Sequence, residues 1–172
     1  VAYDSRRVRA GDLFVAVEGL RADGHAFLAD ALARGAAAVA VDRPASVPPG
    51  TAVLHVPSTR TGLADIAAEF YGRPSRRLKL AGVTGTDGKT TTTHMAEHVL
   101  QASGILAGAM STVAYKVSGR ETDNISGQTT AEAPEVQAWL ARMVGAGASC
   151  AVIETTSHAL VQERVRACEF DV

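Results

Sequence analysis

The sequence of 172 residues predicts an α/β fold: a small N-terminal α/β domain over residues 1–76, followed by part of a doubly wound, mostly parallel sheet domain over residues 77–172. Three observations lead to this prediction. Short apolar runs alternate with segments whose apolar residues recur at helical spacing. One apolar run leads through a glycine-rich turn into a helix. Residues 72–77, which hold Gly, Pro and three arginines without apolar periodicity, separate two sets of elements.

The first set of elements is predicted to alternate strands and helices. Phe27, Leu28 and Leu32 recur at helical spacing, and Gly35 follows as a helix stop. A second helix begins after a Ser-Thr cap and ends at Gly72. The expected strands are 13–17, 37–41 and 52–56, and the expected helices are 25–34 and about 59–72.

The second set continues the alternation, which predicts a parallel sheet with helical crossovers. A pair of strands is expected within 107–117, with a turn at Ser118–Gly119. The last residues, 168–172, are typical of the start of a further strand, so we expect the chain to be truncated. The other expected elements are strands 79–83 and 150–154 and helices 89–102 and 134–144.

Composition and charge exclude several classes of function. The net charge is −1, basic residues are scattered and aromatic residues make up only 5%, so nothing predicts a surface for nucleic acid. No apolar stretch is long enough to span a bilayer and no signal-peptide pattern opens the chain, so we expect no membrane insertion. Cys150 and Cys168 lack metal-ligand spacing, which predicts reduced core thiols in a cytoplasmic protein.

The most informative segment runs from Leu80 to Thr90, where an apolar strand meets a glycine-rich turn and then a helix. Glycines let backbone N–H groups approach phosphate oxygens, and the helix N-terminus adds partial positive charge. Lys89 can reach the β- and γ-phosphates, and the Thr90 hydroxyl can ligate Mg²⁺. The spacing is unusual, because the glycine of the common pattern is replaced by Val83 and Gly82 lies one residue too early. The expected ATP-binding residues are Gly85, Thr86, Asp87, Gly88, Lys89, Thr90 and Thr91.

Glu154 is the second informative residue, because it ends an apolar strand where open parallel sheets place their ligands. A carboxylate there can hold a Mg²⁺ that bridges phosphates, or it can be an ordinary exposed or capping group. The phosphate loop follows an earlier strand, which we expect to lie two strands away from Glu154 in the same sheet. This loop favours the metal site over the ordinary carboxylate. The alternatives for other polar residues are structural: a helix cap for Thr129–Thr130, a helix start for His158 and a simple turn for Asp4-Ser5-Arg6.

Taken in order along the chain, these motifs resemble the Mur ligases, in particular the branch that adds the third amino acid to the peptidoglycan precursor. The resemblance includes the unusual spacing of the glycine-rich loop. Each motif alone is weak, but the ordered set is highly specific. The similar segments are Asp4-Ser5-Arg6, Gly11 to Ala16, Asp23-Gly24-His25, Tyr71 to Ser75, Thr84 to Thr90, Thr129–Thr130, Glu154 to Leu160, Gln162, Arg164 and Phe170-Asp171-Val172.

The resemblance implies an ATP-dependent amide ligase. ATP would phosphorylate the terminal carboxylate of a UDP-N-acetylmuramoyl dipeptide, and the amine of an incoming amino acid would then attack the acyl phosphate. Lys89 and Glu154 would be the catalytic residues, and Thr90 and Glu154 would ligate Mg²⁺. Residues 1–76 would bind the UDP-sugar and residues 77–172 would be an incomplete P-loop ATPase domain of a monomer. The residues expected to bind the substrate are Ser5, Thr129, Thr130, Thr156, Gln162 and Arg164.

The chain departs from the family pattern at several positions. Asp87 stands where the family usually has Asn, and its negative charge should weaken ATP binding. Thr156 replaces a serine, Gln128 an asparagine and Ala131 a proline. The remainder of the central domain and the third domain of the family are not within these residues, so we expect the chain to be inactive alone. The alternatives are a non-catalytic module that binds nucleotide or UDP-sugar, and a related folylpolyglutamate or cyanophycin synthetase.

Overall fold

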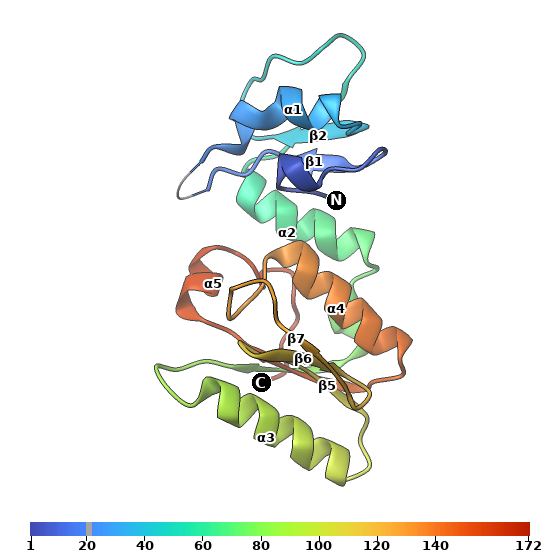
Figure 1. Ribbon diagram of the computed structural model, residues 1–172, viewed down its shortest axis with the longest axis vertical. Helices are drawn as coiled ribbons and strands as arrows, with labels where there is room; N and C mark the ends of the chain where they lie inside the picture. Colours follow the sequence, from blue (N-terminus) through green and yellow to red (C-terminus); the bar gives the residue numbers. More distant parts are fainter. Residues whose placement is uncertain (20–21) are drawn as a thin grey trace. The chain divides into compact units, whose positions relative to one another are not determined.

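The computed structural model describes residues 1–19 and 22–172, and it divides into two compact units, Val1–Ala67 and Ala68–Val172 (Figure 1). Both units combine a sheet with helices, which confirms the α/β fold. The division falls within helix α2 (Thr59–Phe70), whereas the domain boundary was expected after residue 76. The limit between the two functional domains therefore stays a prediction.

The first unit is built on a three-stranded parallel sheet in the order β1-β2-β3. Phe14 and Val39, from neighbouring strands, are fully buried and pack with Leu28 and Ala31 of the covering helix. Strand β3 is exposed along its whole length, so the core lies on the β1–β2 side. The elements are η1 (Ser5–Arg7), β1 (Leu13–Val15), η2 (Gly24–Phe27), α1 (Leu28–Ala33), β2 (Ala38–Val41), β3 (Ala52–His55) and the start of α2.

Two aspartates fix the helix starts of this unit. The predicted helix 25–34 begins as a 3-10 turn because the Asp23 carboxylate accepts a hydrogen bond from the backbone N–H of His25 at 3.0 Å. Asp42 accepts hydrogen bonds from the backbone N–H and the hydroxyl of Thr59, at 2.9 and 2.8 Å, and so caps α2. Burial alone would raise the pKa of Asp42, but the Thr59 hydrogen bonds and the nearby His25 hold it below its ordinary value.

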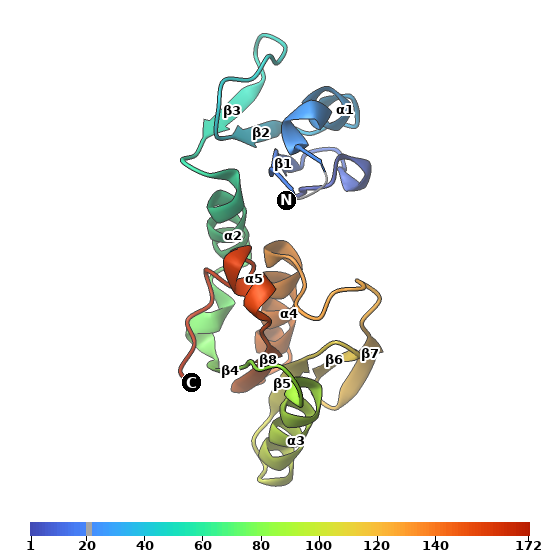
Figure 2. The ribbon, with the colours of Figure 1, turned by 90° about the vertical axis from the view of Figure 1, so that its left-hand side faces the viewer.

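The second unit is a five-stranded sheet in the order β4-β8-β5-β6-β7 (Figure 2). The first three strands are parallel, and the β6–β7 hairpin extends the sheet in antiparallel fashion. Helix α3 covers one face and helix α4 the other, which confirms the doubly wound, mostly parallel prediction (Figure 1). The elements are η3 (Pro74–Arg77), β4 (Lys79–Val83), α3 (Lys89–Ala102), β5 (Ala107–Met110), β6 (Ala114–Val117), β7 (Arg120–Asp123), α4 (Ala133–Gly145), β8 (Cys150–Glu154) and α5 (Ser157–Val161).

The core of this unit lies between the sheet and α4. Leu80 and Ile153 come from neighbouring strands, and Val136, Leu140 and Met143 recur on α4 at spacings that place them on one helix face. All five side chains are at most 1% exposed. The core therefore holds β4 and β8 side by side, and their carboxyl ends lie at the same edge of the sheet.

Two details of the second unit differ from the sequence prediction. The turn at Ser118–Gly119 joins β6 to a third strand, β7, and both residues have positive φ, 51° and 76°, as a tight two-residue hairpin turn requires. Residues 168–172 do not form a strand. Their backbone nevertheless bonds to β4, from Asp171 N–H to the Leu80 carbonyl and from Gly82 N–H to the Val172 carbonyl, both at 2.8 Å.

The cysteines are free, but only one lies in the core. Cys168 is buried, and this burial raises the pKa of its thiol to about 12, so the thiol stays protonated at neutral pH. Cys150 is half-buried at the start of β8, and the expectation of a core thiol is wrong for this residue. Among the helices of the described residues, none combines the length and the apolar character that a membrane crossing needs.

Candidate functional site

The glycine-rich loop lies where the sequence places it, between the end of β4 and the start of α3. Gly88 occupies the cap position of α3 with φ 76°, a left-handed conformation that glycine adopts without strain. Thr86 and Asp87 are exposed, so the loop is open to a ligand. The Lys89 ammonium group donates hydrogen bonds to the carbonyls of Gly85 at 2.8 Å and Thr86 at 3.1 Å, and it therefore lies over the loop. Thr91 is exposed on the first turn of α3.

Thr90 and Glu154 meet directly at the carboxyl edge of the sheet. The Thr90 hydroxyl donates a hydrogen bond of 2.9 Å to Oε1 of Glu154, a residue that is only 1% exposed. Glu154 pairs in register with Val83, the last residue of β4. Strand β8 is thus the immediate neighbour of β4, and the expected separation of two strands is wrong. The adjacent register explains the short distance, because both residues leave the sheet at the same level.

A third residue, Thr112, binds the other carboxylate oxygen of Glu154. Its backbone N–H and its hydroxyl both donate to Oε2, at 2.6 and 3.0 Å. Thr112 was missed by the sequence analysis. The available signal was its position two residues after Met110, at the carboxyl end of the parallel strand β5, where ligand-binding residues gather.

His94 supports this arrangement from one helical turn beyond Thr90. Its Nε2 lies 2.9 Å from the hydroxyl oxygen of Ser111, the fully buried residue before Thr112. The same hydroxyl oxygen accepts hydrogen bonds from the backbone of Val113 and Ala114, at 3.3 and 3.1 Å. His94 therefore fixes the turn that presents Thr112 to the Glu154 carboxylate.

The predicted substrate-binding residues Thr130, Thr156, Gln162 and Arg164 form a cluster behind Glu154. The Thr130 hydroxyl donates to the Glu154 carbonyl at 2.8 Å and accepts from the backbone N–H of Thr156 at 3.1 Å. Arg164 is 8% exposed and donates to the Thr130 carbonyl and to Oε1 of Gln162, both at 2.8 Å. Its Nε lies 3.0 Å from a Glu132 carboxylate oxygen.

The helix-cap alternative for Thr130 is wrong, because the cap position of α4 is Glu132. Thr156 is the residue that caps a helix, since its hydroxyl accepts the Ala159 N–H at the start of α5. His158 lies in the first turn of α5 and is exposed. Thr129 is half-buried beside Thr130.

Ser5 belongs to the first unit, whereas the loop residues belong to the second. It is buried in the 3-10 turn η1, and its hydroxyl hydrogen-bonds the Asp30 carboxyl. This bond, together with that of Arg34, holds the pKa of Asp30 below its ordinary value. Ser5 therefore already has a structural partner in its own unit.

The donor set at Thr90 and Glu154 fits a hard cation. Hydroxyl and carboxylate oxygens are the ligands that Mg²⁺ prefers, and Mg²⁺ usually keeps water and substrate phosphates as its other ligands. The described residues contain no group of three or more His, Cys, Asp or Glu that could hold a metal ion. The open glycine-rich loop beside the carboxylate leaves room for those phosphates.

Two family models match this chain. Residues 1–71 match the Mur ligase family, catalytic domain, and residues 83–172 match the Mur ligase middle domain. The chain belongs to the Mur ligase family. Residues 83–172 of this Mur ligase chain include the glycine-rich loop, Thr112 and Glu154, so these residues lie within the matched middle domain.

Curated relatives extend the match over the entire chain. The UDP-N-acetylmuramyl-tripeptide synthetases of Roseiflexus sp. (strain RS-1) and Deinococcus radiodurans are 51% and 45% identical over the full chain. The UDP-N-acetylmuramoyl-L-alanyl-D-glutamate--2,6-diaminopimelate ligase of Geobacter sulfurreducens is 41% identical over 98% of it. The chain spans only 34%, 36% and 33% of the lengths of these proteins.

Solved structures of Mur ligases show the same fold. A UDP-N-acetylmuramoyl-L-alanyl-D-glutamate--2,6-diaminopimelate ligase superposes with a TM-score of 0.79 at 25% identity, over 98% of this chain and 34% of that one. The MurF ligase of Thermotoga maritima in complex with ADP gives a TM-score of 0.67 at 25% identity, over 99% and 35%. The latter protein binds an adenine nucleotide, as the glycine-rich loop predicts for this chain.

Proposed function

We propose that this chain is the N-terminal and central part of an ATP-dependent ligase that adds the third amino acid to UDP-N-acetylmuramoyl dipeptide. The single observation that carries the proposal is the hydrogen bond from Thr90 to Glu154 beside the glycine-rich loop. It joins a residue of the helix start to a buried carboxylate on the adjacent strand, as a magnesium nucleotide site needs. The tripeptide synthetases among the relatives support the choice of reaction.

In this proposal, the loop holds ATP through its backbone. Gly85 to Gly88 and the first turn of α3, including Thr91, surround the phosphates. Lys89 exchanges its two carbonyl partners in the loop for phosphate oxygens and stabilises the charge that develops on the transferred phosphoryl group. That group passes to the terminal carboxylate of the dipeptide, and the amine of the incoming amino acid then displaces it to form the amide.

Magnesium would be held by the Thr90 hydroxyl and the Glu154 carboxylate. When bound there, it neutralises phosphate charge during transfer between two anions. The chain itself contributes a carboxylate that is already oriented, because Thr112 binds its second oxygen through two hydrogen bonds. Orientation before binding reduces the entropy that must be lost when the nucleotide arrives.

The remaining assignments of the proposal concern the muramoyl substrate. Residues 1–76, with Ser5, would bind the UDP-sugar, and residues 77–172 the ATP. Thr129, Thr130, Thr156, Gln162 and Arg164 would bind the peptidyl part, and the buried cluster around Arg164 supplies their rigidity. The protein would act as a monomer in the cytoplasm.

The test of the proposal is ligand binding to the purified chain. We expect UDP-N-acetylmuramoyl dipeptide to raise the melting temperature, and folate and simple nucleosides to leave it unchanged. ATP should bind in a magnesium-dependent manner, as measured by calorimetry. A chain that binds ATP and magnesium but not the muramoyl dipeptide would contradict the muramoyl substrate and favour a related ligase.

A non-catalytic nucleotide-binding module is the second candidate, and Asp87 is the observation that favours it, because its carboxylate adds negative charge to the loop. The two candidate functions predict different rates of ATP turnover when the protein encoded by the whole gene is assayed. A ligase forms ADP only when dipeptide precursor and amino acid are both present, whereas a binding module forms none under any of these conditions.

A further inference from the structure

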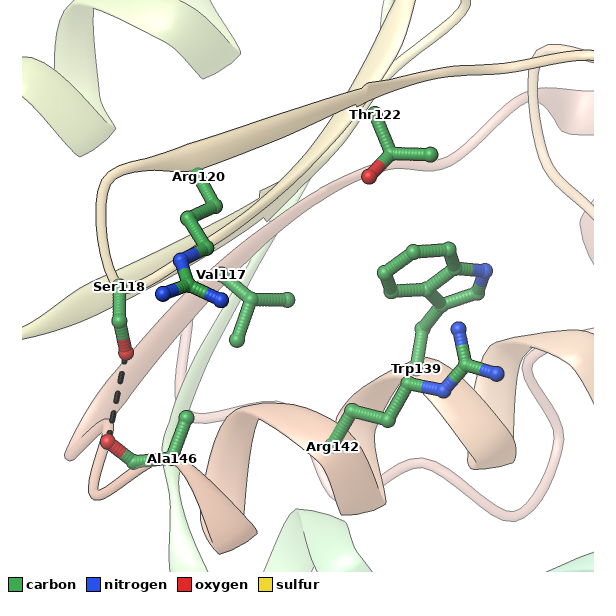
Figure 3. A pocket seen from close by; sticks show the side chains of 7 residues that line it. All are labelled: Val117, Ser118, Arg120, Thr122, Trp139, Arg142 and Ala146. Atoms are coloured by element: carbon green, nitrogen blue, oxygen red, sulfur yellow. Dashed lines mark hydrogen bonds between the residues drawn. The ribbon is translucent and has the colours of Figure 1, made fainter.

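A cavity of about 520 Å³ lies between the β6–β7 hairpin and helix α4 (Figure 3). Its volume is within the range that holds small molecules. Val117 and Ala146 line it with apolar surface, and Trp139 presents its indole ring toward the hairpin. Two arginines, Arg120 from β7 and Arg142 from α4, also line the cavity. The cavity thus combines an apolar wall with two cations.

The sequence pattern of the hairpin explains why Arg120 faces this cavity. Side chains alternate along a strand, so Arg120 and Thr122 of β7 lie on the α4 side of the sheet. Glu121 lies between them and points to the other side of the sheet, where its Oε2 is 3.5 Å from Nζ of Lys116. The acidic side chain of the hairpin is therefore directed away from Arg120.

Trp139 and Arg142 of α4 and its C-cap residue Ala146 recur at intervals of three and four residues, which places them on one side of the helix. The Arg142 guanidinium lies 4.6 Å from the centre of the Trp139 ring. A guanidinium stacked in this way keeps the N–H groups of its edge available for an anion. Trp139 is in turn held by Tyr115, at 5.0 Å between ring centres in an edge-to-face arrangement.

Neither arginine of the cavity has a carboxylate partner within residues 1–19 and 22–172. Arg6, Arg34 and Arg76, by contrast, each form an ion pair with an acidic side chain. Two guanidinium groups left without a counter-ion beside an aromatic wall are complementary to an organic anion.

We infer that this cavity is a binding site for a small organic anion, whose carboxylate or phosphate pairs with Arg142 beside Trp139 while its apolar or aromatic body lies against the Trp139 ring. Arg120, on the hairpin wall, adds positive charge across the cavity (Figure 3). The site is separate from the proposed ATP site. Strand β6 runs antiparallel to β5, so the hairpin turn after Val117 lies toward the amino ends of the parallel strands. Glu154 and the glycine-rich loop lie at their carboxyl ends. The inference does not depend on the proposed ligase activity.

The chain offers a direct signal for this site, because Trp139 is its only tryptophan. Titration with phenyl phosphate should change the Trp139 fluorescence in a saturable manner. Isophthalate carries carboxylates on a similar ring. If isophthalate binds more tightly than phenyl phosphate, the site prefers a carboxylate, and if phenyl phosphate binds more tightly, the site prefers a phosphate. Inorganic phosphate, which lacks the ring, should bind at least about tenfold more weakly, and neutral benzyl alcohol should give no saturable change.

Variants decide whether the cavity is responsible. Arg142→Ala should weaken phenyl phosphate binding by about tenfold or more, since it removes a charge-assisted contact. Arg120→Ala should weaken it by about two- to fivefold, since Arg120 contributes its charge across the cavity. The matched control is Arg77→Ala, an exposed arginine outside the cavity, which should stay within about twofold. Lys89→Ala should also leave the signal unchanged, because the phosphate loop lies elsewhere. Circular dichroism confirms that each variant is folded.

Two results would overturn the inference. One is the absence of a saturable fluorescence change with both aromatic anions in the folded wild-type chain. The other is a change that persists at the same affinity when Arg120 and Arg142 are replaced together, or that is weakened as much by Arg77→Ala. Either result would mean that the two guanidinium groups do not select the anion.

Discussion

The two edges of the second unit treat their charged groups in opposite ways. At the carboxyl edge, the buried Glu154 carboxylate receives hydrogen bonds from Thr90 and Thr112. The buried Arg164 donates hydrogen bonds to Thr130 and Gln162 and pairs with the Glu132 carboxylate. At the amino edge, Arg120 and Arg142 are exposed and have no acidic partner in the described part of the chain. Buried charges need fixed partners, because burial without them costs several kcal/mol.

This difference separates charged groups that already have partners within the chain from charged groups that have none in the described residues. The carboxyl edge is pre-organised, so a ligand there meets groups that are already oriented. The amino edge keeps guanidinium donors available but does little for stability. The same type of side chain, arginine, should therefore give opposite results at the two edges when it is removed.

The largest effect is expected for Arg164→Met. The substitution keeps much of the side-chain volume but leaves Glu132 and the Thr130 carbonyl without their partner, so the free energy of unfolding should fall by about 3–5 kcal/mol. Arg120→Ala, the matched exposed change, should stay within about 0.5 kcal/mol of the wild type. Urea unfolding followed by circular dichroism measures both. Equal losses in the two variants would contradict the contrast between the edges.

The next effect concerns the carboxylate itself. Glu154→Gln preserves the shape but removes the charged oxygen ligand, so magnesium-dependent ATP binding should weaken by roughly 100-fold. ATP binding without magnesium should change little, because the loop backbone is intact. Calorimetry with and without magnesium separates the two contributions. Glu121→Gln, on the exposed strand β7, is the control and should bind magnesium ATP as the wild type does. An unchanged Glu154→Gln variant would argue against a metal role.

A smaller effect is expected for His94→Ala. The change frees the Ser111 turn and lets Thr112 move away from Glu154, so the affinity for magnesium ATP should fall by about tenfold. His94→Gln, whose side-chain amide can again hydrogen-bond the Ser111 hydroxyl, should restore part of the affinity. His98, one turn further along α3 and exposed, provides the matched control His98→Ala. Should His98→Ala weaken binding as much, His94 would have no specific positioning role.

The sequence predicts the framework of this site well, because loop and strand-end positions are local properties. Glu154 could be predicted from its place at the end of an apolar strand, and Lys89 and Thr90 from the loop. The strand order could not be predicted: β8 lies between β4 and β5, so Glu154 is closer to the loop than expected. Thr112 could not be predicted, because a lone threonine after a strand carries no distinctive pattern. Its contact with Glu154 becomes evident only once the order of the strands is known.

The contacts that depend on several elements at once are the least predictable. The bond between His94 and Ser111 joins α3 to the turn after β5, and no spacing along the chain indicates it. The cavity at Trp139 likewise requires the hairpin register, which directs Arg120 toward α4 and Glu121 away from it. The turn at Ser118–Gly119 was recognised from sequence, but not the third strand that it creates.

The smallest effect is expected for Asp87→Asn. Asp87 is exposed in the loop, so its charge repels the phosphates through solvent, and removing it should tighten ATP binding by about two- to fivefold, as for other exposed charges. The gain should vanish in about 1 M salt, where the Debye length is only about 3 Å. Asp123→Asn, an exposed change on β7, controls for net charge and should have no effect. If Asp87→Asn instead weakens binding, the carboxylate takes part in holding the magnesium nucleotide, and the carboxyl edge then supplies two acidic groups to the ligand rather than one.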